Sequence, residues 1–240
     1  MGSISWSKIA TYAGLVLFLF TAFCLGLPFW PAVLGAGSWI IAVILKVGLG
    51  PLFKIDTTRP LGGGLWGLWS CISELGLAAV IFLWLKYQTI FEALSFGLGA
   101  GLLEYTLIAG SIAFRQQIEG VSKLVHELES NDSMTNYEAK TTNIESEDYW
   151  HTLYERIFAT LGHVASRTLV WLCLLQGVWL AGFTAVITFS LVDGTVCILQ
   201  GRNYDFEDSA KLYKFLHFNA FVSSFECMVL SVLVHFGGST

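Results

Sequence analysis

Charged residues are scarce in this chain. Only 13% of its 240 residues are Asp, Glu, Lys or Arg, whereas 55% are hydrophobic. A soluble globular domain carries about 25% charged residues, so this chain has too few charged side chains to cover a water-facing surface. The composition therefore predicts an all-α, polytopic membrane helix bundle, and the length predicts a single membrane domain over residues 1–240.

The usual signatures of nucleotide, metal and nucleic-acid binding are also missing. The sequence contains no phosphate-binding loop, no dinucleotide fingerprint, no HExxH zinc-protease motif and no basic nucleic-acid patch. Its five cysteines lie in or near separate apolar runs and form no CxxC pair, which is typical of small core residues rather than of a disulfide frame. We expect no metal, no cofactor and no nucleic-acid partner.

Long apolar runs dominate what is present. A membrane helix needs about 17–25 apolar residues, and seven runs reach that length: 8–29, 31–53, 65–85, 90–113, 152–173, 175–193 and 214–236. The first is too long for a signal-peptide core and leads to no cleavage site, so we expect an uncleaved anchor. Little more than a turn near Gln176 separates the fifth and sixth runs, so six spans with one re-entrant segment is the alternative.

The segment 114–150 is the one sizeable polar piece, and we expect an acidic soluble loop. Between residues 116 and 150 it holds eight acidic residues and two lysines. Apolar residues near its start recur on one helical face, which predicts a short amphipathic helix over 120–130, followed by flexible chain over 130–147. A solvated linker is the expected role, and a loop that binds a substrate or partner is the alternative.

Lys and Arg are distributed unevenly between the two sides of the expected bundle. The side of the N-terminus would carry nine of them: Lys8, Lys54, Arg59, Arg115, Lys123, Lys140, Arg202, Lys211 and Lys214. The opposite side would carry little besides Lys86. Because cytoplasmic loops are enriched in Lys and Arg, we expect the N-terminus and the acidic loop to be cytoplasmic.

Ionisable residues nevertheless lie inside the apolar runs. Glu74, Glu104 and His163 fall near the middle of the third, fourth and fifth runs, and Asp193 ends the sixth. An ionisable residue at membrane depth costs about 2.5–3.5 kcal/mol on insertion scales, so such a residue is a functional candidate. The first three lie at similar depth, which predicts one polar pocket between helices.

Neighbouring residues refine this prediction. Gly97, Gly99, Ala100 and Gly101 give the fourth helix a flat face that another backbone can approach closely. Ser166 lies one turn from His163, but a helical serine more often bonds to its own backbone than to a catalytic histidine.

Three functions use a buried group of Glu and His. A glutamate that activates water, helped by a histidine, could hydrolyse a peptide bond inside the bilayer. Protonated glutamates could instead hold neighbouring helices together without catalysis. A proton or ion path also uses buried Glu and His, but such paths usually show broken helices or internal repeats, and neither is clear here.

The spacing of these groups resembles a known family. Five segments in the second to sixth runs are similar to motifs of the YhfC family of membrane peptidases. They are AVLGAGSWIIAVILKVGLGPLF, ISELG, GLGAGLLE, ERIFATLGHVAS and FSLVDG. These are relatives of the CAAX-prenyl-protease group of glutamic-type intramembrane proteases. The resemblance runs from about Ala32 to Gly194. The fifth run carries the most specific match, with Glu, Arg, Phe and His at the family's spacing.

The resemblance implies a site and a substrate. It implies that Glu74, Glu104 and His163 are catalytic and that Glu155, Arg156 and Asp193 support them. Glu74 would be the water-activating base, and His163 would assist the transition state or a metal. The partners implied are membrane lipids and a transmembrane or lipid-attached polypeptide.

Four positions depart from the family pattern. In the third run, Ser73 stands where the family's Glu-Glu-x-x-Arg motif has its first Glu, and Leu77 stands where that motif has its Arg. Ala100 stands where the Gly-rich segment has a His, and Phe189 stands where the family has a His before Asp193. Two of three expected histidines are thus missing, so a histidine metal site is hard to build. Without an Arg nearby, Glu74 has less reason to stay ionised, although Lys46 in the second run could replace that charge. A degenerate member would bind a membrane helix in the same groove without cutting it.

His217 and Glu226 in the seventh run are further polar candidates, and His217 is expected at the membrane interface.

Overall fold

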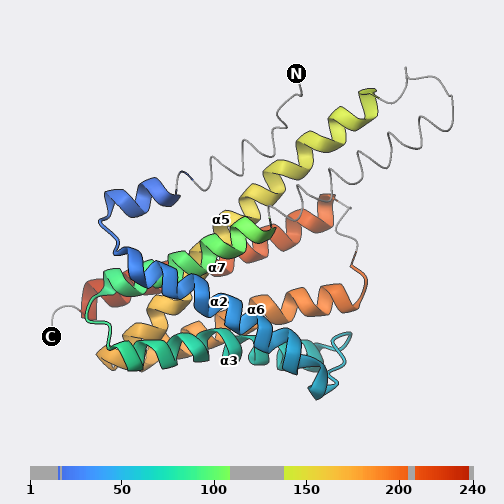
Figure 1. Ribbon diagram of the computed structural model, residues 1–240. Coiled ribbons are helices and arrows are strands. Elements are labelled where there is room, and N and C mark those ends of the chain that lie inside the picture. The colour runs from blue at the N-terminus through green and yellow to red at the C-terminus, as the bar shows by residue number, and fades with distance from the viewer. Residues whose placement is uncertain (1–15, 17, 109–137, 205–208, 238–240) are drawn as a thin grey trace.

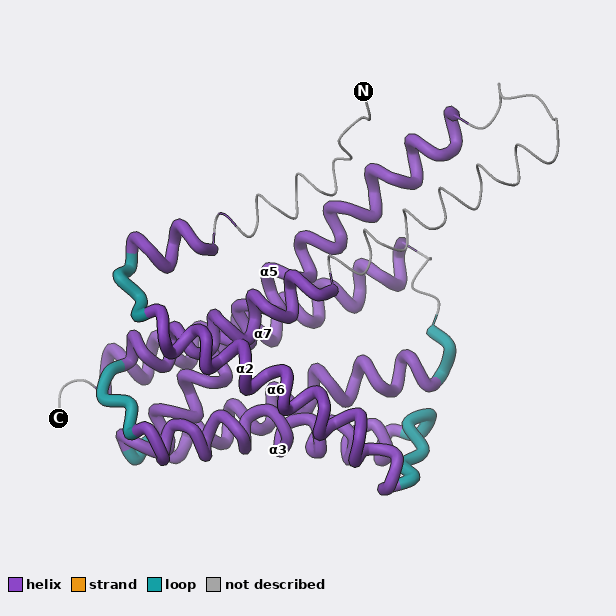
Figure 2. Tube along the Cα trace, viewed as in Figure 1, coloured by secondary structure: helices purple, strands orange, loops and turns teal. Residues whose placement is uncertain are grey.

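The computed structural model describes residue 16 and residues 18–108, 138–204 and 209–237, the stretch 138–153 by its backbone alone. These residues form helices joined by short loops, with no strand among them (Figures 1 and 2). The helices are α2 (Phe29–Leu49), the 3₁₀ turn η1 (Gly50–Phe53), α3 (Pro60–Leu85), a helix over Ile90–Ile108, α5 (Glu138–Gln176), α6 (Trp179–Gly201) and α7 (Ser209–Gly237).

Six of these helices are long and apolar enough to cross a membrane. They correspond to the second to seventh predicted runs, so the protein is an all-α, polytopic membrane helix bundle. Of the first predicted run, 8–29, residues 8–15 and 17 lie outside the described residues, whereas 18–24 are helical and end at a turn before α2. The predicted amphipathic helix over 120–130 lies wholly outside the described residues. α6 has 23 residues and is long and apolar enough for a full crossing. The alternative, in which one segment is re-entrant, stays a prediction.

Two predicted boundaries are wrong. The sixth run was expected to end at Asp193, but α6 continues to Gly201, so Asp193 lies inside the helix. An unpaired aspartate would end an apolar run, but this carboxylate has a cation 3.2 Å away, the Nζ atom of Lys46 on α2. The prediction of flexible chain over 130–147 is wrong for 138–147, because α5 begins at Glu138, in a stretch that includes good helix formers such as Ala139 and Lys140. Residues 130–137 lie outside the described residues.

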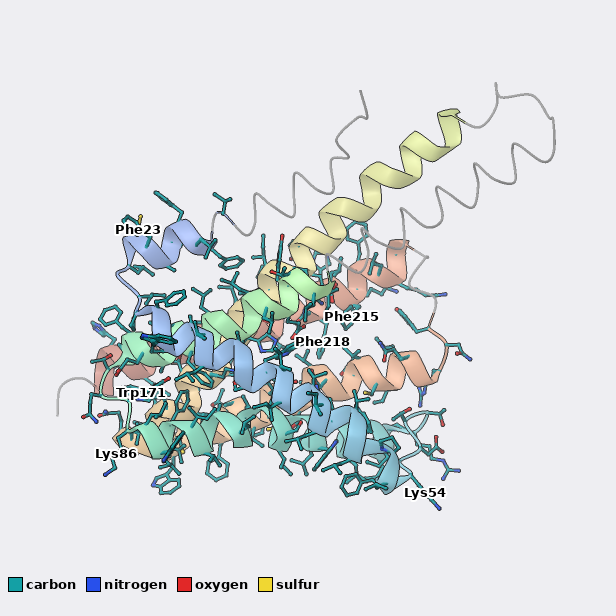
Figure 3. The ribbon with its side chains drawn as sticks, viewed as in Figure 1. Phe23, Lys54, Lys86, Trp171, Phe215 and Phe218 are labelled. Carbon is teal, nitrogen blue, oxygen red and sulfur yellow. The ribbon has the colours of Figure 1, made fainter. Side chains whose placement is uncertain are left out.

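The loops gather at two ends of the bundle. Lys54 and Lys86 mark these opposite ends in Figure 3. At the Lys54 end, the Nε atom of Arg202 donates to the backbone carbonyl of Thr58, 2.7 Å away. The hydroxyl and N–H of Thr58 also hold the pKa of Asp56 below its usual value. At the Lys86 end, Trp171 Nε1 donates to the carbonyl of Tyr87 at 3.1 Å.

The Ile90–Ile108 helix packs closely against both α2 and α5, as its predicted flat face requires. A Cβ atom at Gly99 would lie 1.9 Å from the carbonyl oxygen of Ala32 on α2. A Cβ atom at Gly97 would lie 2.7 Å from Cα of Val164 on α5. Small residues therefore let two helices approach this one at backbone distance.

The apolar core lies between the polar groups and the Lys86 end. Its centre is the aromatic cluster of Phe82, Tyr87 and Phe96, in which the rings of Phe82 and Phe96 have centroids 4.9 Å apart. Leu169 and Trp171 of α5 are buried in the same core. This packing fixes α3, α5 and the Ile90–Ile108 helix next to the polar groups described below.

Candidate functional site

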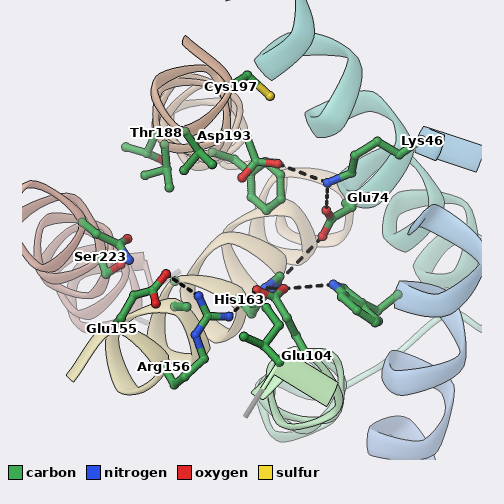
Figure 4. Close-up of a pocket in the computed structure, with 18 of the residues that line it drawn as sticks. Lys46, Glu74, Glu104, Glu155, Arg156, His163, Thr188, Asp193, Cys197 and Ser223 are labelled. Atoms are coloured by element: carbon green, nitrogen blue, oxygen red, sulfur yellow. Dashed lines mark hydrogen bonds and ion pairs between the residues drawn. The ribbon is translucent and has the colours of Figure 1, made fainter. Parts of the chain in front are cut away.

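A cavity of about 480 Å³ lies within the bundle and is lined by residues from all six long helices. All six predicted site residues line it: Glu74, Glu104, Glu155, Arg156, His163 and Asp193. Figure 4 shows them converging from different helices. The predicted meeting of Glu74, Glu104 and His163 in one polar pocket is therefore confirmed.

Glu104 accepts hydrogen bonds from three side chains on two helices, α2 and α5. Its Oε2 atom lies 2.5 Å from His163 Nε2 and 3.0 Å from Trp39 Nε1. Its Oε1 atom accepts from Arg156 Nη1 at 2.9 Å. The Glu104 side chain is 18% exposed, so the carboxylate reaches the cavity while its position is fixed.

The ring of His163 lies between a carboxylate and a guanidinium. Its Nδ1 atom is 2.5 Å from Arg167 Nη1, and its Nε2 atom faces Glu104. A guanidinium can only donate, so Nδ1 must accept and the ring proton must be on Nε2. His163 is therefore a neutral donor that orients the carboxylate of Glu104. The ring of Phe189 approaches it edge-on, with centroids 6.2 Å apart.

Glu74 lies deeper and is held by two cations. Lys46 Nζ is 2.6 Å from Oε1, and Arg167 Nη2 is 3.0 Å from Oε2. The prediction that Lys46 supplies a charge to Glu74 is confirmed. The expectation that Glu74 has no Arg nearby is wrong, because the guanidinium comes from α5 rather than from the position of Leu77 on α3.

Two further pairs extend this network at its ends. Asp193 lies 3.2 Å from Lys46 and accepts a hydrogen bond from the hydroxyl of Ser70. At the other end, Arg156 also pairs with Glu155. Carboxylates and cations therefore lie next to one another through the bundle, and each carboxylate of this network has a Lys or Arg nitrogen within 4.0 Å, as the burial of charge requires.

Sequence reasoning missed three members of the network: Trp39, Ser70 and Arg167. A signal for Arg167 was available, because it lies inside the predicted fifth run and one turn after His163, on the same helical face. Trp39 and Ser70 gave no such signal, since a lone Trp or Ser in an apolar helix has many possible roles.

Other sequence candidates lie in different surroundings. Ser166 Oγ donates to the carbonyl of Gly162 at 2.7 Å, so the predicted bond to its own backbone is confirmed. His217 is exposed on α7, where its ring stacks on that of Tyr213. Glu226 lines the cavity, on the side formed by α6 and α7.

No group of three or more His, Cys, Asp or Glu side chains in the described ranges is arranged to hold a metal ion. The carboxylates of Glu74, Glu104, Glu155 and Asp193 are instead paired with Lys or Arg. The arrangement offers a fixed carboxylate, a neutral imidazole and paired cations around a cavity.

No protein-family model, curated protein or solved structure matches this chain. The likeness to the YhfC family therefore rests on the sequence motifs alone and stays a prediction.

Proposed function

We propose that this protein is an intramembrane peptidase, similar to the YhfC family, in which Glu104 activates the attacking water. The supporting observation is the pairing of Glu104 with His163 on the wall of a cavity that is lined by the six long apolar helices. A carboxylate offers about four acceptor positions, and Trp39, His163 and Arg156 fill three of them. The fourth is available to a water molecule in the cavity.

Access to water favours Glu104 over Glu74 as the base. The side chain of Glu74 is 3% exposed, whereas that of Glu104 is 18% exposed. Glu74 also accepts from two full cations, which weakens a carboxylate as a proton acceptor. In this proposal Glu74 positions Lys46 and Arg167, and through Arg167 it fixes the tautomer of His163.

The proposed reaction is direct attack of water on a peptide carbonyl. Glu104 takes one proton from the water as its oxygen bonds to the carbonyl carbon. The guanidinium of Arg156, on the same wall, stabilises the negative charge that develops on the carbonyl oxygen. Glu104 then gives the proton to the amide nitrogen, the C–N bond breaks, and the products are a new carboxyl terminus and a new amine. His163 keeps the carboxylate in place throughout.

A second candidate is a scaffold that binds a membrane helix in the same groove without cutting it. The observation that favours it is Phe189, which packs against the edge of His163 where the family pattern has another histidine. An apolar ring there reduces the polar surface that a transition state could use.

Cleavage of membrane-spanning peptides separates the two candidates. The full chain in lipid vesicles is incubated with a mixed library of such peptides, and the products are read by mass spectrometry. We expect cuts by the wild type and by Glu92→Gln, and none by Glu104→Gln. Glu92 lies in the first turn of the Ile90–Ile108 helix, where its carboxylate accepts from the N–H groups of Gln88 and Thr89, and it does not line the cavity. A library left intact by the wild type would favour the scaffold.

The orientation in the membrane is part of this proposal. Lys54, Arg59 and Arg202 lie at one end of the bundle, where α7 also begins with Lys211 and Lys214, whereas Lys86 lies at the other. This bias supports a cytoplasmic Lys54 end, which would also hold the N-terminus and the acidic segment. The partners would be lipids and a transmembrane or lipid-attached polypeptide.

A further inference from the structure

Glu226 on α7 differs from the other carboxylates that line the cavity. Its side chain is buried, with 3% of the residue exposed. Glu74, Glu104, Glu155 and Asp193 each have a Lys, Arg or His nitrogen within 4.0 Å, and within the described parts of the chain Glu226 has none. Its recorded hydrogen bond comes from the neutral hydroxyl of Thr188 on α6.

The surroundings of Glu226 form a second polar region of the cavity. Thr188, Asn219 and Ser223 line the cavity with it, and Figure 4 shows Thr188 and Ser223 on the side away from Lys46. A Cβ atom at Gly162 would lie 3.7 Å from Glu226 Oε2, so this carboxyl group faces the residue next to His163 on α5. A ligand group at Glu226 would therefore lie beside the proposed site of water attack.

The charges around the cavity favour a cationic ligand. Five carboxyl groups line the cavity, whereas Lys46, Arg156 and the adjoining Arg167 supply three cations. Since His163 is neutral, the cavity has a formal excess of negative charge. A cation at Glu226 would offset this excess and give the carboxylate the partner that a buried charge requires.

We propose that Glu226, with Ser223 and Asn219, binds a primary ammonium group, such as the side chain of a lysine. The three donors of an ammonium ion match the carboxylate, hydroxyl and amide oxygens at this place. In a substrate, the ammonium group would belong to a basic residue beside the cleaved bond. This substrate preference rests on the proposed peptidase function. Binding of the ammonium group itself requires no cleavage.

Binding of n-butylammonium to the full chain tests this site directly. The protein is placed in nanodiscs of zwitterionic phosphatidylcholine, and the fluorescence of its tryptophans, two of which (Trp39 and Trp66) line the cavity, reports the titration. We expect saturable binding to the wild type, at least tenfold weaker binding to Glu226→Gln, and wild-type affinity in Glu92→Gln, whose carboxylate is outside the cavity. n-Butanol, of similar shape but uncharged, should not bind.

Three results would overturn the proposal: no saturable binding of n-butylammonium to the wild type, equal affinity in Glu226→Gln, or equal affinity for n-butanol. Should Glu226→Gln not fold, Ser223→Ala and Asn219→Leu each remove an acceptor and should bind n-butylammonium more weakly than Glu92→Gln does; equal affinity in all three would overturn the proposal. Binding without any peptide cleavage would contradict the peptidase proposal and leave this site standing. Peptide cleavage without binding of n-butylammonium would contradict this site and leave the peptidase proposal standing.

Discussion

At the scale of single residues, Arg167 connects the two carboxylates on which the proposed chemistry depends. One of its Nη atoms bonds to Glu74 and the other to His163, which in turn bonds to Glu104. The residue is 1% exposed. Its charge therefore has to be balanced inside the protein, and its loss would leave Glu74 with a single cation.

Replacing Arg167 should destabilise the protein strongly. Because breaking a buried ion pair leaves an uncompensated charge, we expect Arg167→Met to lower the free energy of unfolding by about 3–5 kcal/mol. Arg202→Met, which removes an exposed guanidinium bonded to a loop carbonyl, should cost at most about 1 kcal/mol. Denaturant titration in detergent micelles measures both. Similar losses in the two variants would contradict the central position of Arg167.

The sequence predicted much of this site and missed part of it for a physical reason. Glu74, Glu104 and His163 could be found because a charge or imidazole in an apolar run is costly, and so marks a polar pocket. Lys46 followed as a counter-charge. The tautomer of His163 and the bond from Trp39 could not be predicted, because both depend on how the helices are rotated against one another, which a single sequence does not state.

At the scale of helices, the close approach of α2 to the Ile90–Ile108 helix holds Trp39 against Glu104. The contact depends on Gly99, which faces the backbone of Ala32. The glycine pattern predicted that some backbone would approach here, but not which one. The sequence does not predict the end of α6, because the cation that allows Asp193 to lie inside the helix, Lys46, is on α2, which is far from α6 in the sequence.

A methyl group at Gly99 should force the two helices apart. Overpacking in a close interface typically lowers the free energy of unfolding by about 1–3 kcal/mol, and we expect Gly99→Ala to lower it by that amount. Gly48→Ala is the matched control, because a Cβ atom there would have no neighbour within 4 Å. It should be neutral or slightly stabilising, since alanine favours helix over glycine. Thermal unfolding in nanodiscs compares them, and a Gly99→Ala protein as stable as wild type would refute this packing.

At the scale of the whole molecule, alternating helices place the 54–59 loop and residues 202–204 at one end and the 86–89 loop at the other. The membrane character could be predicted from composition alone, because too few charged residues remain for a water-facing surface. The sidedness depends on the distribution of Lys and Arg and stays a prediction.

Cysteine labelling in intact cells tests the sidedness. In a chain whose five native cysteines are replaced by serine, Gln88→Cys should react with a membrane-impermeant maleimide added outside. Thr58→Cys should react only after the cells are opened, because the cluster of Lys54, Arg59 and Arg202 predicts that its end is cytoplasmic. The reverse pattern would mean that the protein is oriented the other way.

The most direct test of the central claim is hydrolysis by the purified protein in water enriched in ¹⁸O. If Glu104 activates water, each membrane-spanning peptide that is cut should carry ¹⁸O in its new carboxyl terminus, and Glu104→Gln should yield none of this product. Products that form equally with Glu104→Gln, or no labelled product from the wild type, would contradict the account.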